Sequence, residues 1–264
     1  MIRFGFSLFF WTFITASSLA LFPVAVLLWA MTGPFDRRKV LLHRFTCFWA
    51  SLYSWFNPAW PVTVTGREKI PRDQACVMVA NHLSLVDILI LFRLQTHFKW
   101  VSKSENFRVP FIGWNMSLND YIQLKRGDKA SVRRMMRHCE QTLAAGSSVM
   151  MFPEGTRSPT GRMRSFKTGA FEMALKARTP ILPIVIHGTA DALPKRGFVL
   201  QGRHPIRIEV LDLIPYESFA DKSVEELTRD VRNVIAEHVV TDGGDAVAPR
   251  SKRAARAARA AAEA

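Results

Sequence analysis

The chain has 264 residues, 48% of them apolar, so it is long enough to bury a sizeable core. Its formal net charge of +14 calls for a polyanionic partner, either a nucleic acid or an anionic membrane surface. The three cysteines, Cys47, Cys76 and Cys139, are widely spaced without a CxxC pair, which argues against a disulfide framework or zinc site and favours a reducing compartment.

The first predicted element is an apolar helix. No charged residue occurs from Phe4 to Phe35, and a helix over this run, at about 1.5 Å per residue, exceeds the roughly 30 Å of a bilayer core. Pro23 and nearby hydroxyl side chains leave a spanning helix, a kinked helix and a re-entrant hairpin open. A cleaved signal peptide fits less well because the apolar run continues far beyond Ala20.

A second helix is predicted after the basic sequence DRRK. It carries an aromatic-rich stripe, typical of an interfacial helix beside a membrane, made of Leu41, Phe45, Phe48, Trp49, Leu52 and Phe56. A soluble helix that packs this stripe into the core is the alternative. The excess of Lys and Arg after the apolar run places the main body in the cytoplasm.

Beyond residue 61, strand-length apolar runs alternate with helical patterns. The runs predict strands at 75–80, 98–102, 121–124, 148–152, 181–186 and 206–214. The helical patterns predict helices at 85–94, 130–145, 169–177 and 223–240. This alternation predicts an α/β fold with a mostly parallel or mixed sheet flanked by helices, preceded by the apolar membrane-associating segment.

We therefore divide the chain into three parts. Residues 1–60 form membrane-embedded or interfacial helices, residues 61–242 form the α/β domain, and residues 243–264 form a basic tail rich in Ala and Arg. The low complexity of this tail is compatible with disorder or with a helix on the membrane surface.

The sequence NHLSLVD, residues 81–87, follows the first of these strands. His82 and Asp87 cannot share one helix and meet, because five residues turn the helix by about 500°, which leaves their side chains some 140° apart. We therefore place His82 on the turn, with Ser84 as the helix N-cap and Asp87 reaching back towards His82. A simple Ser-x-x-Asp cap explains part of this pattern, whereas a catalytic pair also explains the histidine.

A second polar motif, FPEGTRS, follows the strand at 148–152. Arg157, with the hydroxyls of Thr156 and Ser158, suits a phosphate cradle, although a solvated loop would have the same composition. Lys103 and Arg126 stand near the ends of two other strands. In an α/β sheet such motifs gather at the carboxyl edge, where ligands bind.

Together these blocks resemble the glycerolipid acyltransferases, and within them the 1-acyl-glycerol-3-phosphate acyltransferases. NHLSLVD corresponds to the NHxxxxD block, KSENFRVPFIGW to the Lys-x-Glu segment, FPEGTRS with FKTGA to the third block, and ILPIVI to the proline-containing fourth block. The resemblance covers roughly residues 62–215. One departure is Lys125, a base where many members have the aspartate of Ile-Asp-Arg.

The resemblance implies transfer of an acyl group from acyl-CoA or acyl carrier protein to a membrane lysolipid, without cofactor or metal. His82 would be the general base and Asp87 its partner. Substrate phosphate would be bound by Arg157, Arg126 and Lys103, and the acceptor and oxyanion region would comprise Glu154, Gly155 and Thr156. We expect the protein to be located at a bacterial inner membrane, with its catalytic domain on the cytoplasmic face and near anionic lipid.

Three alternatives remain. The acceptor is another lysophospholipid or a lyso-aminolipid, as the Lys125 departure suggests. A second alternative is a membrane-anchored basic protein that binds nucleic acid. No nucleic-acid motif accompanies the charge, however, and nucleic acid is not the partner that we expect. The third alternative is a lipid-binding scaffold without catalysis.

Overall fold

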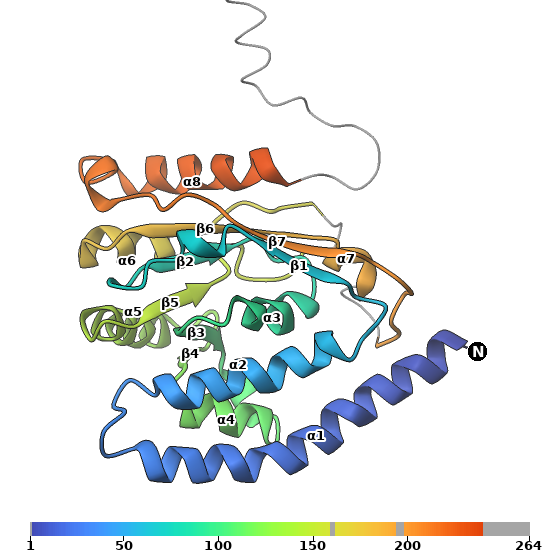
Figure 1. The fold of residues 1–264 in the computed structure, drawn as a ribbon. Coiled ribbons are helices and arrows are strands. Elements are labelled where there is room, and N and C mark those ends of the chain that lie inside the picture. Colours follow the sequence, from blue (N-terminus) through green and yellow to red (C-terminus); the bar gives the residue numbers. More distant parts are fainter. Residues whose placement is uncertain (1, 159–161, 194–197, 240–264) are drawn as a thin grey trace, which may run out of the picture.

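The N-terminal segment forms a helical hairpin. A computed structural model describes residues 2–158, 162–193 and 198–239. Helix α1 (Ile2–Thr32) continues through Pro23 and bends in its middle part, and α2 (Val40–Trp55) returns alongside it (Figure 1). The hydroxyl groups of Ser17 and Ser18 lie 3.2 and 3.3 Å from the Tyr53 hydroxyl, which ties the two helices together.

Among the described residues, α1 is the one helix long and apolar enough to cross a membrane by length and composition. The aromatic stripe of α2 is divided between the surface and the core. Leu41, Phe48 and Phe56 are exposed, Phe45 and Leu52 are half-buried, and Trp49 is buried in the core. Packing into the core therefore holds for Trp49 and partly for Phe45, and is wrong for the three exposed members.

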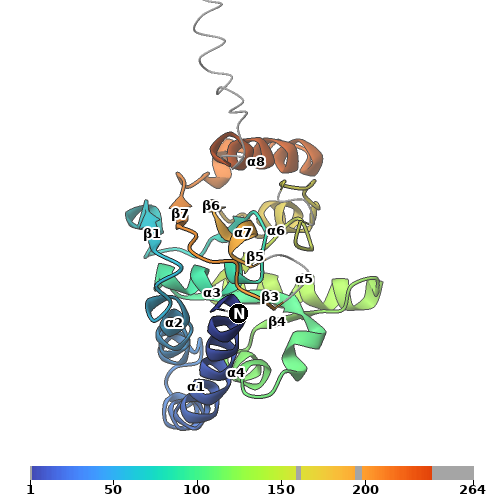
Figure 2. The ribbon, with the colours of Figure 1, turned by 90° about the vertical axis from the view of Figure 1, so that its right-hand side faces the viewer.

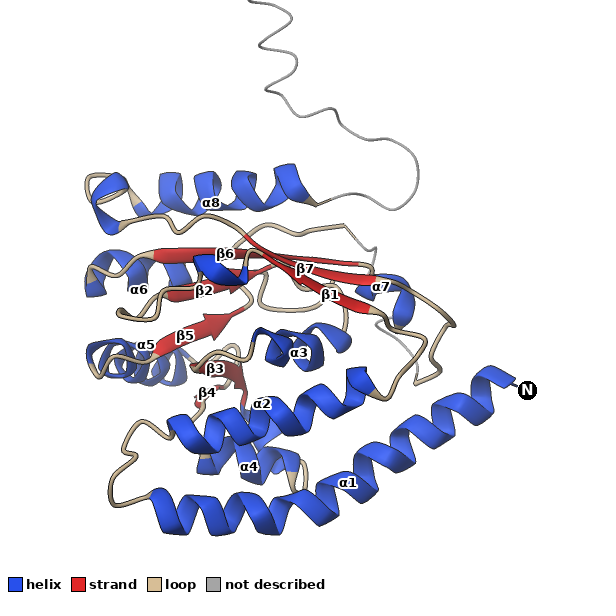
Figure 3. Cartoon of the chain, viewed as in Figure 1, coloured by secondary structure: helices blue, strands red, loops and turns tan. Residues whose placement is uncertain are grey.

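A seven-stranded sheet forms the middle layer of the molecule (Figure 3). Its strands are β1 (Val62–Thr65), β2 (Val77–Ala80), β3 (Phe98–Lys103), β4 (Ile122–Leu124), β5 (Ser148–Met151), β6 (Ile181–His187) and β7 (Ile206–Val210). The spatial order is β1-β7-β6-β2-β5-β3-β4, and every neighbouring pair is parallel except β6 and β7. The predicted mostly parallel, mixed sheet is thus confirmed.

Two helical layers cover the sheet, and the alternation along β2 shows why. Val77 and Val79 join one core and Met78 and Ala80 the other, because successive strand residues point to opposite faces. Helices α1, α2 and α3 (Val86–Leu91) belong to the Met78 core, and α5 (Lys129–Ala144), α6 (Gly169–Ala177) and α8 (Val224–His238) to the other (Figure 2).

Six strands and four helices of the α/β domain agree with the sequence predictions, with small shifts at their ends. Strand β1 and helices α4 (Ile112–Leu118) and α7 (Thr189–Ala192) were not predicted. Short 3-10 turns complete the elements: η1 (Arg67–Lys69), η2 (Phe92–Leu94), η3 (Ser104–Arg108) and η4 (Tyr216–Ser218). The basic tail lies outside the described residues, and the three-part division of the chain stays a prediction.

Candidate active site

The two polar motifs meet at the carboxyl edge of the sheet. Strands β2 and β5 are parallel neighbours with Val77 opposite Val149, so the residues that follow them emerge side by side. NHLSLVD follows β2, and PEGTRS follows β5. Asn81 closes the end of β2 by bonding both the amide and the carbonyl of Ile186 on β6, at 2.8 and 2.9 Å.

His82 and Asp87 form a buried pair on the turn after β2. His82 Nδ1 lies 2.8 Å from Asp87 Oδ2, and the same oxygen accepts the amides of Leu83 and Ser84 at 2.6 and 2.8 Å. Because a carboxylate only accepts, Nδ1 carries the ring proton and Nε2 carries the lone pair. This arrangement fixes the histidine tautomer that a general base needs.

The role predicted for Ser84 as N-cap is wrong. The helix begins at Val86 with Leu85 at the N-cap, so Asp87 is the second helical residue. Asp87 occupies the Ser84 amide, while the Ser84 hydroxyl donates to the Leu193 carbonyl at 2.7 Å. Ser84 therefore ties the turn to the segment after β6, and the aspartate still reaches back as predicted.

An aromatic residue that the sequence analysis did not single out lies against the imidazole. The ring of Phe152 stacks on His82 with centroids 3.9 Å apart and planes 10° from parallel. The ring of Trp100 also contacts Phe152, with the two ring centroids 5.5 Å apart. The contact with Asp87 thus fixes the rotation of the His82 ring about its Cβ–Cγ bond, and Phe152 covers one face of that ring.

Glu154 joins the two motifs through the backbone. Its buried carboxylate accepts the His82 amide at 2.7 Å on one oxygen and the Arg164 amide at 2.9 Å on the other. Burial is the main cause of the raised pKa of this carboxyl. The Ser158 amide also joins the two turns, because it donates to the His82 carbonyl at 3.0 Å. Both Glu154 oxygens therefore hold loops in place.

Gly155 occupies a turn that suits glycine. Its φ is 70°, and a Cβ there would lie 3.0 Å from the Lys167 side chain. Its amide donates to the Phe152 carbonyl at 3.0 Å, and the amides of His82, Leu83 and Ser84 also have protein acceptors. The next residues of the turn, Thr156 and Arg157, are half-buried at the same edge.

The predicted phosphate-binding cations lie at increasing distance from His82. Arg157 is on the turn after β5, the strand next to β2, whereas Lys103 ends β3 and Arg126 follows β4. At about 4.8 Å between strands, β3 lies roughly 10 Å and β4 roughly 14 Å from β2. The structure therefore brings Arg157 to the pair and leaves Lys103 and Arg126 further along the edge.

Lys103 already has an anionic partner. Its ammonium lies 2.9 Å from a Glu105 carboxylate oxygen, and this contact lowers the pKa of Glu105 to about 2. Arg126 is exposed two residues beyond β4. In the described ranges, no group of three or more His, Cys, Asp or Glu side chains could hold a metal.

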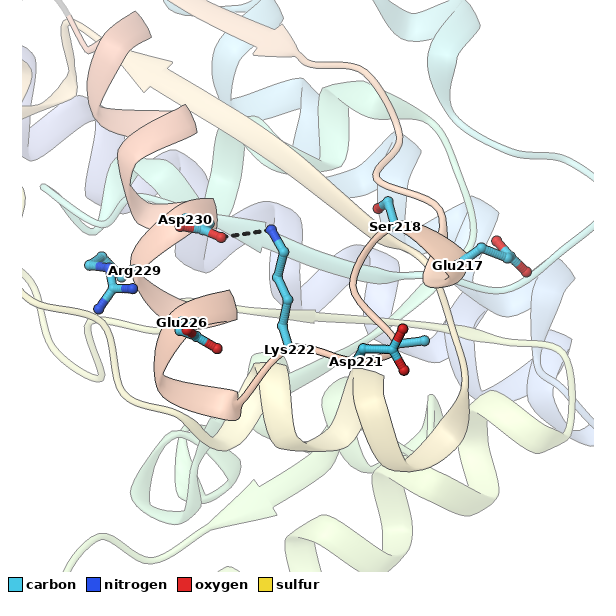
Figure 4. Close-up of a pocket in the computed structure, with 8 residues that line it drawn as sticks. Glu217, Ser218, Asp221, Lys222, Glu226, Arg229 and Asp230 are labelled. Atoms are coloured by element: carbon cyan, nitrogen blue, oxygen red, sulfur yellow. Dashed lines mark hydrogen bonds and ion pairs between the residues drawn. The ribbon is translucent and has the colours of Figure 1, made fainter.

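A hollow lies at the opposite, amino edge of the parallel strands, where α8 begins (Figure 4). The edge is identified by Ile214, which bridges to Ile181 at the start of β6 just before this segment. The hollow has a volume of 320 Å³, and Lys222 and Asp230 pair across it at 2.8 Å. None of the predicted site residues lines it.

The chain is similar to known proteins in sequence and in fold. Residues 61–187 match the family model described as Acyltransferase. The 1-acyl-sn-glycerol-3-phosphate acyltransferase of Borreliella burgdorferi is 30% identical over 187 residues, which cover 68% of this chain and 72% of the relative. The enzyme of that name from Chlamydomonas reinhardtii is 39% identical over 188 residues, 70% of this chain and 55% of the relative.

A chloroplastic 1-acyl-sn-glycerol-3-phosphate acyltransferase from Brassica napus is 37% identical over 205 residues, 77% of this chain and 58% of the relative. The chain thus spans less than two thirds of these algal and plant relatives. By fold, it matches the crystal structure of the acyltransferase PlsC from Thermotoga maritima with a TM-score of 0.73 and 24% identity, covering 90% of this chain and 95% of the other.

Proposed function

This chain belongs to the acyltransferase family, and from that premise we propose that it transfers a fatty acyl group from an acyl thioester to the sn-2 hydroxyl of 1-acyl-glycerol 3-phosphate, giving phosphatidic acid. The observation that carries the proposal is the His82–Asp87 pair, which leaves Nε2 as a base beside the Arg157 turn. The names of the relatives support the choice of acceptor.

In the proposed reaction the acceptor hydroxyl is the nucleophile. Its oxygen attacks the thioester carbonyl as its proton passes to His82 Nε2, and Asp87 stabilises the imidazolium that forms. When the tetrahedral intermediate collapses, the carbon–sulfur bond breaks and the departing thiolate takes the proton from Nε2. Atoms and charge balance without any other reactant.

Direct transfer is favoured over an acyl-enzyme. The sequence has no GxSxG motif, and Cys139 is buried in α5, where desolvation raises the pKa of its thiol to about 12. Burial likewise raises the pKa of Cys76 to about 11 and that of Cys47 to about 12. These thiols stay protonated near neutral pH, which makes them poor nucleophiles.

We assign the acceptor phosphate first to Arg157, because its turn lies next to His82. Lys103 would join by exchanging Glu105 for the phosphate, and Arg126 would contribute a more distant charge. Glu154 would act by positioning the two loops. Because the Gly155 amide is already bonded, the oxyanion region is proposed at the Thr156 end of the turn.

The location that fits this chemistry is a membrane surface. Lysolipid and product both stay in the bilayer, which α1 and the exposed residues of the α2 stripe would contact, while the thioester arrives from the cytoplasm. A bacterial inner membrane with anionic lipid suits the basic chain. Acyl-CoA and acyl carrier protein both remain candidate donors, and the positive charge would attract an acidic carrier.

An acceptor panel tests the proposal. Purified protein is given a labelled acyl thioester and vesicles that contain 1-acyl-glycerol 3-phosphate, another lysophospholipid or a lyso-aminolipid. We expect roughly ten-fold or greater preference for 1-acyl-glycerol 3-phosphate, because one charge-assisted phosphate contact contributes about that factor. Equal or faster acylation of the other lysophospholipid or of the lyso-aminolipid would overturn the assignment.

The Lys125 departure is the feature that favours a different acceptor, so the same panel is run on Lys125→Asp. Lys129→Asp serves as the matched control, since Lys129 is an exposed lysine four residues further along. If residue 125 determines which acceptor lipid is preferred, the order of acylation rates among the lipids changes with Lys125→Asp and not with the control.

A further inference from the structure

The segment before α4 contains a strained turn. Phe111 has φ 61° and ψ −55°, and the Ile112 amide donates to the Pro110 carbonyl at 2.6 Å, which closes a three-residue γ-turn. This turn is rare for a residue with a side chain because positive φ crowds the Cβ. Strain of this kind persists where the surrounding structure holds it, and it marks candidate functional segments.

The inner side of the segment is held closely. A Cβ on Gly113 would lie 2.5 Å from the Asn106 carbonyl oxygen, so the chain approaches η3 more closely than any other residue would allow. Further along α4, the side chains of Asn115 and Asn119 both donate to Thr46 Oγ1 of α2, at 3.1 and 3.0 Å. These contacts fix the turn against the helical hairpin.

The outer side presents apolar side chains. Val109, Ile112 and Trp114 are 44%, 38% and 46% exposed. The rings of Phe111 and Trp114 both meet Phe22 of α1, with centroids 5.8 and 5.6 Å apart. Helix α4 lies alongside α1 in both views (Figures 1 and 2). The exposed apolar surface of α1 thus continues onto a segment some ninety positions away in the sequence.

We infer that residues 109–114 are a second lipid-contacting surface, which enters the bilayer interface beside α1. This inference rests on the proposed membrane location. Tryptophan is enriched at the membrane–water boundary, and the exposed Arg108 immediately before the segment suits the anionic headgroups at that level. Continuity with the apolar surface of α1 makes lipid, rather than a protein partner, the occupant.

The inferred surface gives the site a fixed position relative to the bilayer. Lys103 ends β3 at the carboxyl edge of the sheet, and Val109 follows it by six residues through η3. Lipid contact at 109–114 would therefore hold the Lys103 end of the site near the headgroup layer. An acceptor would need to leave the bilayer by only a short distance.

A fluorescent label on a single introduced cysteine tests the inference. The three native cysteines are buried, so Ile112→Cys in the full chain can be labelled selectively. Val132→Cys is the matched control, because Val132 is 40% exposed on α5 in the opposite helical layer. Leu19→Cys on the exposed side of α1 reports the proposed membrane helix. Quenching is measured with anionic vesicles that carry lipid-attached quenchers.

The expected result is strong quenching at positions 112 and 19 and none at 132. Quenching at 19 without quenching at 112 would overturn the inference and leave the membrane location intact. Absence of quenching at both would overturn the membrane location as well. Protection of the 112 label without vesicles, rising with protein concentration, would indicate a second copy of the chain and would also contradict the inference.

A binding measurement provides a second test. Ile112→Asp is expected to weaken vesicle partition by roughly ten-fold or more, because it removes apolar contact and adds a charge repelled by anionic lipid. Val132→Asp should leave partition unchanged. Equal partition of both variants and the wild type would contradict a lipid contact at position 112.

Discussion

The two parts of the proposed site lie along one edge of the sheet but are built differently. At the His82–Asp87 pair, one buried carboxylate oxygen takes three donors, and the imidazole is covered on one face by Phe152. At the cationic part, Arg126 is exposed and Lys103 has an acid for a partner. The acid–base part is therefore preformed, whereas the proposed phosphate-binding part would be completed by the substrate.

This difference predicts different kinetic effects. Changes in the preformed part should lower kcat, because they remove interactions that matter in the transition state. Changes among the cations should mainly raise the KM for the lysolipid, because they remove binding that substrate and transition state share. The following variants probe that division in order of expected effect.

Among changes that keep His82, the largest effect is expected at Asp87. Asp87→Asn replaces an acceptor of three hydrogen bonds with an amide that favours the wrong histidine tautomer, so kcat should fall by about 10² to 10⁴ with little change in acceptor KM. Steady-state kinetics of the purified protein measure both. The exposed Asp120 provides the control, Asp120→Asn, and a loss confined to KM would break the comparison.

Glu154→Gln should have the next largest effect. Its amide nitrogen would face a backbone N–H, either His82 or Arg164, and leave a buried donor unpaired at a cost of about 1–3 kcal/mol. We expect kcat to fall by roughly ten- to a hundred-fold, together with a lower denaturation midpoint. Normal kcat with a normal midpoint would show that Glu154 does not position the turn.

Arg157→Lys should mainly affect binding. A lysine keeps the charge but cannot form the two-pronged contact of a guanidinium with phosphate, so acceptor KM should rise about ten-fold with kcat nearly unchanged. Arg162→Lys, at an exposed position nearby, is the control. A fall in kcat with unchanged KM would place Arg157 in the preformed part instead.

The smallest effect is expected at Lys103. Lys103 is the main cause, with hydrogen bonds from the backbone and Ser104, of a Glu105 pKa lowered from 4.5 to about 2. This carboxylate therefore contributes stability above its unfolded pKa and loses it as the pH falls towards 2. Lys103→Met should move the Glu105 pKa back up towards 4.5, as carbon NMR of the carboxyl can measure, and raise acceptor KM a few-fold. An unmoved Glu105 pKa would exclude the pair as its cause.

Much of the fold could be predicted from local patterns. The apolar runs predicted the strands from β2 to β7, because β2, β5 and β6 carry dense apolar side chains buried on both faces and the other three each bury apolar residues on at least one face. Strand β1 was missed because its short sequence VTVT is half exposed and lies between proline and glycine. Helix α4 was missed because its γ-turn at Phe111 follows no local sequence rule.

The site was predicted where partners are near in sequence. The His82–Asp87 contact joins a residue on the turn to a residue in the first turn of α3, only five positions later, so the local sequence is enough to predict it. The stacking of Phe152 and the two backbone contacts of Glu154 could not be read this way. They depend on β2 and β5 lying side by side, and these strands are separated by about seventy residues.

The most direct test of the central claim is the turnover of purified His82→Ala with a labelled acyl thioester and 1-acyl-glycerol 3-phosphate in vesicles. His138→Ala, which removes an exposed histidine from α5, is the matched control. We predict that His82→Ala stays folded and loses at least about 10² to 10⁴ in kcat, while the control keeps it. Near-normal turnover of His82→Ala would contradict the assignment of His82 as the general base.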